Sequence, residues 1–253
     1  MADKKIFLVL ICAFCFNFAF AQVPSQLEQI RIQVWADLDP FPGKFDDFND
    51  CDDDEENLSK GQNLSPENEK TNQSEFEQIF GFAINRTKEI APFLISGMIY
   101  GFNFEYTPYD KRRNVAEYWN FTPIKEISKN TNQLEYKNPI AMENKLVCWV
   151  YCDRTKEQTQ EFEHWNSVVY PKIKGKGSAS IENGFESIKE ACSEAAKLAV
   201  REYWRTMIKN KPKEISGKLL LIGNPRIYIS EGQYVTDLDF FMETDKIIPY
   251  TQF

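Results

Sequence analysis

Histidine is almost missing from this chain, because His164 is the only one among 253 residues. Histidine-dependent triads and His-Glu-x-x-His zinc sites need that residue at a fixed spacing from their other members. His164 stands alone in the polar segment Glu161–Trp165, and no Gly-x-Ser-x-Gly motif accompanies it. The scarcity of histidine therefore argues against zinc enzymes and against hydrolases built on a catalytic histidine.

The chain also lacks a complete phosphate-binding or metal-binding motif. The glycine pair at 175 and 177 resembles a P-loop, but Gly177 stands where that loop needs Ser or Thr directly after its lysine. The acidic run Asp50–Glu56 has the charge of a calcium loop, yet Glu55 occupies the position of the required glycine. We therefore predict no catalytic residue, no cofactor and no metal ligand, and we expect a protein that is not an enzyme.

The chain lacks the excess of basic residues that is typical of nucleic-acid-binding proteins. The net charge is −8, and the stretch Lys44–Glu77 alone holds twelve acidic residues against three lysines. The rest of the chain is close to neutral. We therefore expect no nucleic-acid partner, and we predict that the acidic stretch is a disordered insert, because it has too few apolar residues to offset the entropy of ordering.

Long apolar runs are confined to the N-terminus. Lys4 and Lys5 precede the apolar run Ile6–Phe20, which ends in Ala19-Phe20-Ala21. This pattern is typical of a secretory signal peptide cleaved after Ala21; the alternative is a lipoprotein leader in which Cys12 is acylated. No later run reaches the roughly 20 residues of a transmembrane helix. We expect an extracytoplasmic protein, in the periplasm or at the cell surface, without a transmembrane span in its mature chain.

Cysteine is sparse beyond the leader, where only Cys51, Cys148, Cys152 and Cys192 remain. Four cysteines in an exported chain could form two disulfides. Cys148 and Cys152 fall on one predicted strand, about 13 Å apart, so they cannot bridge each other. The sequence favours free buried thiols and leaves their oxidation open.

The apolar periodicity indicates an α+β fold. Alternating or continuous apolar patterns predict strands over residues 30–37, 98–106, 115–121, 134–137, 145–152, 168–180, 218–222, 226–229 and 234–242. Helical spacing predicts helices over residues 76–93 and 184–210, and residues 157–165 are predicted as a short polar helix or a loop. We expect an antiparallel or mixed sheet of about seven strands, with the segment 145–152 central in it and one long helix packed across it.

The long helix carries the clearest local signals. Asn183 is the predicted N-cap, and a seam of small residues, Ala191, Ala195 and Ala199, predicts close packing on a sheet, with Tyr203 and Met207 continuing it. We divide the chain into a signal peptide (1–21), a β-rich N-terminal region (22–166) with the disordered acidic insert at 45–75, and an α/β C-terminal region (167–253).

Two patterns offer a binding function. Basic residues recur every four positions on the long helix, which predicts either an ordinary solvated face or a contact with anionic lipid head groups. Aromatic residues of the strands could instead line a ligand pocket. These two sets are Lys197, Arg201, Arg205 and Lys209 on the helix, and Tyr106, Tyr118 and Trp119 on the strands.

The segment 168–245 resembles a known domain. Gly175–Ser178 leads into the alanine-spaced helix, and Gly232-Gln-Tyr-Val235 opens a later strand. This arrangement is similar to the small α/β domain of bacterial envelope lipoproteins and to the N-terminal domain of the flagellar H-ring assembly protein. The segments Trp35–Gly43 and Lys209–Glu214 also resemble those of a family of spirochaete exported proteins. The resemblance implies a non-catalytic envelope role and supplies no catalytic residues.

We therefore expect a bacterial, exported, non-enzymatic envelope protein with a structural or protein-interaction role, associated with the flagellum or the cell surface. Its expected partners are envelope or surface proteins. The alternative is an extracytoplasmic small-ligand-binding module or hydrolase that uses an aromatic-lined pocket.

Overall fold

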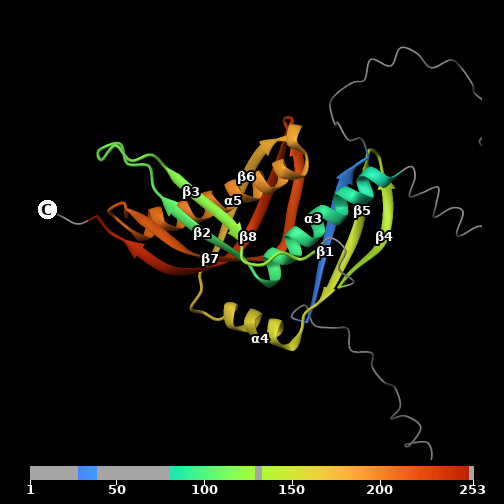
Figure 1. Ribbon diagram of the computed structural model, residues 1–253, viewed down its shortest axis with the longest axis horizontal. Coiled ribbons are helices and arrows are strands. Elements are labelled where there is room, and N and C mark those ends of the chain that lie inside the picture. The colour runs from blue at the N-terminus through green and yellow to red at the C-terminus, as the bar shows by residue number, and fades with distance from the viewer. Residues whose placement is uncertain (1–27, 39–79, 129–132, 251–253) are drawn as a thin grey trace, which may run out of the picture.

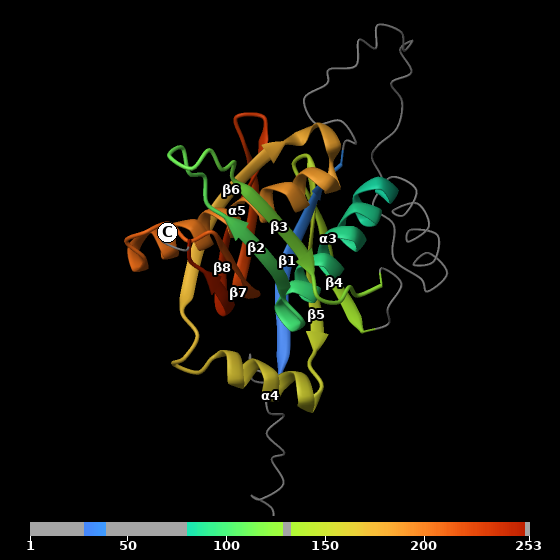
Figure 2. The ribbon, with the colours of Figure 1, turned by 60° about the vertical axis from the view of Figure 1, so that its left-hand side comes forward.

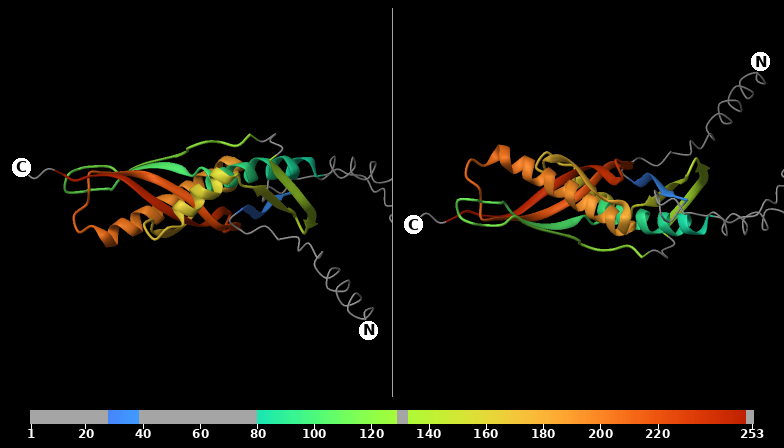
Figure 3. Two further views of the ribbon diagram at one scale, coloured as in Figure 1. Left: turned by 90° about the horizontal axis from the view of Figure 1, so that it is seen from below. Right: turned by 90° about the horizontal axis from the view of Figure 1, so that it is seen from above.

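A computed structural model describes residues 28–38, 80–128 and 133–250 (Figure 1). The predicted signal peptide and the predicted disordered insert lie outside these ranges. The described part of the chain contains two antiparallel sheets that lie at opposite ends of an elongated molecule (Figure 3). Among these residues, no helix has the length and apolar character needed to cross a membrane.

Sheet A has three strands in the order β1-β5-β4. Their bounds are Gln29–Asp37 for β1, Lys145–Asp153 for β5 and Leu134–Met142 for β4. Alternate side chains of β1 and β5, such as Ile32 and Val150, are fully buried on one face. The prediction that the segment 145–152 is a central strand is confirmed.

Sheet B has five strands in the order β3-β2-β7-β8-β6. Their bounds are Tyr118–Pro123 for β3, Phe102–Thr107 for β2, Glu214–Ser230 for β7, Gln233–Ile248 for β8 and Lys172–Ser180 for β6. Because β2 pairs with β7, this sheet joins segments more than a hundred residues apart.

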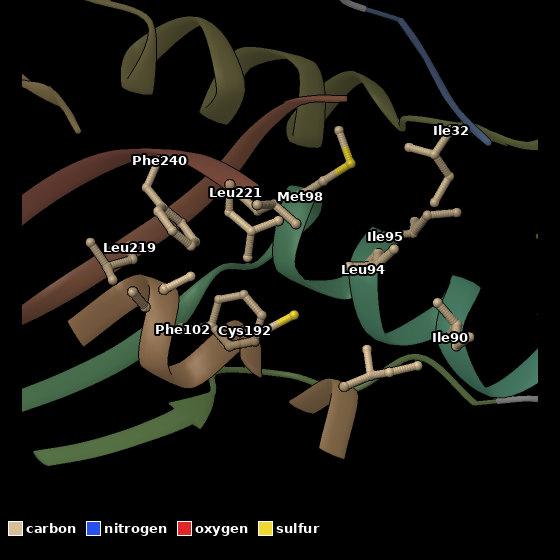
Figure 4. Packing of buried hydrophobic residues seen from close by; sticks show 14 of the residues in the cluster. Ile32, Ile90, Leu94, Ile95, Met98, Phe102, Cys192, Leu219, Leu221 and Phe240 are labelled. Carbon is tan, nitrogen blue, oxygen red and sulfur yellow. The ribbon is translucent and has the colours of Figure 1, made fainter. Parts of the chain in front are cut away.

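The prediction of one sheet of about seven strands is wrong, because eight strands form two sheets with helix α3 (Gly81–Ile99) against both. The second half of α3 is apolar on nearly every side, and such a helix must be covered all round. In Figure 4, Leu94 and Ile95 of α3 lie towards Ile32 of β1, whereas Met98 lies near Leu221 of β7. The two sheets therefore share one core through α3.

The boundary between α3 and β2 also differs from the prediction. The helix continues through Pro92 to Ile99, and the strand begins at Phe102 rather than Met98. Gly101, with φ +78°, makes the turn between them. Short apolar runs fit either periodicity, which is why the residues just before this glycine were assigned to the strand.

The helix α4 (Lys156–Trp165) begins with a capping box formed by Thr155 and Gln158. Its last residue, Trp165, packs with Leu220 and Phe241. These two residues alternate along their strands with residues that face the main core, so α4 covers part of the other face of sheet B. Figure 2 shows α4 beneath the strands.

The long helix α5 (Phe185–Met207) lies on sheet B at very close range. A Cβ atom added to Gly175 would stand 1.9 Å from the Ala195 carbonyl oxygen, and one added to Gly177 would stand 2.3 Å from that of Ala191. Thr236 of β8 also donates a hydrogen bond to the Ala191 carbonyl at 2.9 Å. The predicted alanine seam is therefore confirmed, and the two glycines explain how the helix backbone reaches the strand.

Both ends of α5 differ from the prediction. The N-cap is Gly184, with φ +58°, because residues Ile181–Asn183 form a short 3-10 turn before the helix. Asn183 instead donates its backbone N–H to Ser187 Oγ. At the other end Met207 is 62% exposed, so the buried seam does not extend to the last turn.

The three described cysteines are free and buried. Burial raises the pKa of the Cys148 thiol to about 11 and that of the Cys192 thiol to about 12. Cys152, on the same strand as Cys148, has its pKa raised for the same reason. Cys51 lies outside the described residues. The expectation of free buried thiols is met at these three positions.

We predict that Gly177→Ala lowers the free energy of unfolding by more than about 2 kcal/mol, because its Cβ would overlap backbone atoms of α5 that cannot move aside. Urea denaturation followed by circular dichroism measures this. Gly81→Ala is the control, since a Cβ there meets nothing within 4 Å; it should be neutral or stabilising by up to about 1 kcal/mol. Equal stabilities of the two variants would contradict the close packing.

We also predict that stability falls as the pH rises above about 9. The unfolded thiols ionise near their ordinary pKa of 9.0, whereas Cys192 in the folded protein keeps its proton until about pH 12. The unfolded state therefore loses protons first, and each such thiol adds a loss of about 1.4 kcal/mol per pH unit in this window. Cys192→Ala should show a shallower alkaline decline in denaturation midpoints. Parallel curves for the two proteins would contradict the assignment.

Candidate functional site

An open groove of about 600 Å³ lies between the C-terminal end of α5 and strand β2. Its walls come from three places: the last turns of α5, the segment that follows α5 into β7, and β2 with the loop after it. The lining residues are Tyr106, Pro108, Tyr109, Glu117, Arg201, Trp204, Arg205, Ile208, Lys209, Lys211, Pro212 and Ile215. The C-terminal end of β8 lies at this end of the molecule (Figure 3).

The sequence of α5 explains why a groove forms here. In its middle, alanines meet the glycines of β6 and bring the helix backbone onto the sheet. Towards its end, the larger Tyr203 and Trp204 replace the small residues and pack against the core. The helix ends at Met207, and the segment that contains Pro212 then leads the chain into β7.

The floor of the groove is apolar. Ile215 is fully buried, and Tyr106 is 3% exposed. The Trp204 indole nitrogen is buried without a hydrogen-bond partner, so the ring presents carbon rather than its N–H to the groove. Pro212 is buried as well.

The hydroxyl group of Tyr106, in the floor, already has a partner. The Tyr106 hydroxyl donates a hydrogen bond of 3.0 Å to Glu117 Oε1. Burial, followed by the bond and the negative charge of Glu117, raises the pKa of Tyr106 well above its ordinary range. The tyrosine therefore remains neutral at physiological pH, and it acts as a hydrogen-bond donor rather than as a base.

The rim of the groove is cationic. Arg201, Arg205, Lys209 and Lys211 are all exposed there, against the single carboxylate of Glu117. Arg205 pairs with Glu202, and Lys211 donates to the Tyr109 carbonyl at 2.6 Å. Within the described part of the chain, neither Arg201 nor Lys209 forms an ion pair. This excess of positive charge suits an anion.

The structure divides the predicted basic stripe. Lys197 pairs with Glu194 at 2.6 Å and lies outside the groove. The other three members, Arg201, Arg205 and Lys209, all reach the rim. The stripe therefore consists of one ordinary surface ion pair and three residues of the candidate site.

The predicted aromatic set is also divided. Tyr106 lines the groove, but Tyr118 is 53% exposed and not part of it. Trp119 packs against Tyr106 and donates its indole N–H to Ser193 of α5 at 2.9 Å. This bond connects β3 to α5, so Trp119 helps to position these two elements without lining the groove.

Other residues of interest in the sequence do not reach the groove. His164, on α4, forms a hydrogen bond of 2.9 Å with the Tyr170 hydroxyl group. Gly175 and Gly177 serve helix packing, and the acidic run Asp50–Glu56 lies outside the described residues. Among the described residues, no group of three or more His, Cys, Asp or Glu side chains could hold a metal ion.

The predicted sets hold four of the twelve lining residues, and sequence reasoning missed the other eight, among them Glu117, Lys211 and Pro212. The local signal for the last two is the segment Lys209–Glu214, rich in lysine and containing a proline, which carries only a family resemblance in the sequence analysis. Glu117 precedes β3, and only the pairing of β3 with β2 brings it to Tyr106.

Comparisons with known proteins place the chain among relatives. A protein-family model matches residues 16–250. The chain is 25% identical over 256 residues to a protein of Treponema pallidum (strain Nichols) that is described as uncharacterized, and the match covers 99% of this chain and 96% of the other. No solved structure matches the chain at a significant level.

We predict that Arg201→Ala leaves the free energy of unfolding unchanged or raises it by up to about 0.5 kcal/mol. Arg201 has no ion-pair partner among the described residues, and it repels Arg205 one turn away. Lys197→Ala is the matched control, since it removes an ion pair from the same helix. Thermal denaturation compares the two. A loss above about 1 kcal/mol for Arg201→Ala would mean that this side chain serves the fold.

Proposed function

The chain belongs to the protein family whose model spans residues 16–250, and we propose that it is an exported, non-enzymatic protein that binds an anionic ligand in the groove between α5 and β2. Such a role combines the expected envelope role with the alternative of a ligand-binding module.

One observation carries the proposal: exposed cations surround an apolar, aromatic floor in a groove of about 600 Å³. Natural ligand sites have a similar size, an apolar lining and a few placed polar groups. Arg201 and Lys209 add nothing by ion pairing to the described fold. Their charge is therefore available to a ligand.

The arrangement of the strands favours ligand binding over a docking face. An exposed apolar patch along residues 98–106 would support a protein-interaction role, but Phe102, Phe104 and Tyr106 are buried. The groove instead contains a tyrosine whose pKa is strongly raised. Perturbed groups in a lined hollow are typical of functional sites.

Export is proposed on the N-terminal pattern. The charged head, the apolar run and the Ala-x-Ala end of residues 1–21 support secretion across a membrane. A binding protein in the periplasm or at the cell surface would meet lipids, cell-wall fragments and other envelope components as ligands.

The proposal can be tested with the fluorescent anion 1-anilinonaphthalene-8-sulfonate and the purified folded protein. We predict saturable binding that weakens as salt is added, because exposed charges are screened. Arg201→Glu should weaken it by about fivefold at low ionic strength. Lys88→Glu is the control, since it reverses an exposed lysine of α3 outside the groove.

Because this dye also binds partly unfolded proteins, near-ultraviolet circular dichroism of each variant must match that of the parent. Equal dye affinity in the two variants, or no saturable binding at all, would contradict the proposed function.

A further inference from the structure

We infer that the ligand of the groove is a single-chain anionic amphiphile: one alkyl or acyl chain that carries a phosphate or carboxylate at its end. This inference rests on the proposed function and names the chemical class of its ligand.

The first argument is the separation of apolar and charged surface. The floor is formed by buried Ile215 and Pro212 with the ring of Trp204, whereas Arg201 and Lys209 are exposed at the rim. A ligand that fits both must place an apolar body in the depth and its negative charge at the opening. An alkyl chain with an anionic end has this distribution.

The second argument is the lack of free polar partners in the depth. The Tyr106 hydroxyl is occupied by Glu117, and the Trp204 N–H is buried away from the groove surface. A peptide or a sugar would bury amides or hydroxyls here without hydrogen bonds, and each unpaired group costs free energy. An alkyl chain buries none.

The third argument concerns the head group. Arg201 and Arg205 lie one turn apart on α5, and Lys209 follows two residues after the helix ends at Met207. Like charges at this spacing repel, and a phosphate or carboxylate between them would relieve that repulsion. Arg205 also keeps its bond to Glu202, which leaves Arg201 and Lys209 as the main contacts of the anion.

The test measures how three probes displace the bound dye from the full-length protein. The two alkyl probes are kept below their critical micelle concentrations. Decyl phosphate has both the chain and the anion, inorganic phosphate has the anion alone, and decyl maltoside has the chain with a neutral head. We expect decyl phosphate to displace the dye at a concentration at least about 100-fold below that of inorganic phosphate, because several methylenes are buried. It should also act at least about fivefold below decyl maltoside.

Two variants test the two ends of the ligand separately. Arg201→Glu should weaken the binding of decyl phosphate by about fivefold but leave the binding of decyl maltoside unchanged. Ile208→Gln changes a residue of the groove wall. It should weaken the binding of both alkyl probes and leave the binding of inorganic phosphate unchanged. Ile247→Gln is the control, since this residue is 41% exposed and lies outside the groove.

The outcomes separate this inference from the proposed function. Suppose that the dye binds and that Arg201→Glu weakens dye binding, but that inorganic phosphate competes as well as decyl phosphate. The groove then binds anions, and the assignment of an amphiphilic ligand is wrong. Equal competition by decyl maltoside would also overturn the anionic head. Sedimentation with phosphatidylglycerol vesicles, without any binding of monomeric decyl phosphate, would overturn the inference in favour of a membrane surface contact.

Discussion

The close contact between α5 and β6 is the constraint on which the rest of sheet B depends. Gly175 and Gly177 have no side chains, and Ala191 and Ala195 have the smallest ones, so the helix backbone lies almost against the strand. At this distance the helix cannot rotate or slide without clashing. Its position then fixes which side chains reach β8, where Thr236 bonds to the Ala191 carbonyl, and β3, where Trp119 bonds to Ser193. A single contact thus sets the orientation of the helix relative to the whole sheet.

The second sheet is held by a different device. Helix α3 is apolar on several sides, and it fills the space between β1 and β7 (Figure 4). Two polar contacts strengthen this junction: the Trp35 indole donates to the Ile227 carbonyl at 2.6 Å, and the Tyr234 hydroxyl bonds to Asp37. Ile227 lies near the end of β7 and Tyr234 near the start of β8, so the turn end of this hairpin is tied to β1.

The packing of α5 on sheet B and of α3 between the two sheets explains which parts of the fold could be predicted from the sequence. The alanine seam, the strand β5 and the helix α5 follow from local periodicity, and they were predicted correctly. The division into two sheets depends on which strands pair, and pairs such as β2 with β7 leave no local pattern. The sequence predicts two strands, over residues 218–222 and 226–229, where the structure has the single strand β7 with an irregularity in register between Ile222 and Arg226. The basic stripe and Tyr106 were both visible in the sequence, but only the packing brings them together.

The groove follows from the same packing that stabilises the fold. The helix packs closely onto the sheet at its middle, and beside its end the chain leaves an open space that it lines largely with apolar side chains. Had the space been only a packing defect, neutral residues at its rim would be the stable choice, since Arg201 and Arg205 repel each other on one helical face. The cations instead lie where a bound anion would reverse that repulsion. The cost in the free protein and the gain on binding therefore reside in the same side chains, which is the arrangement expected of a binding site.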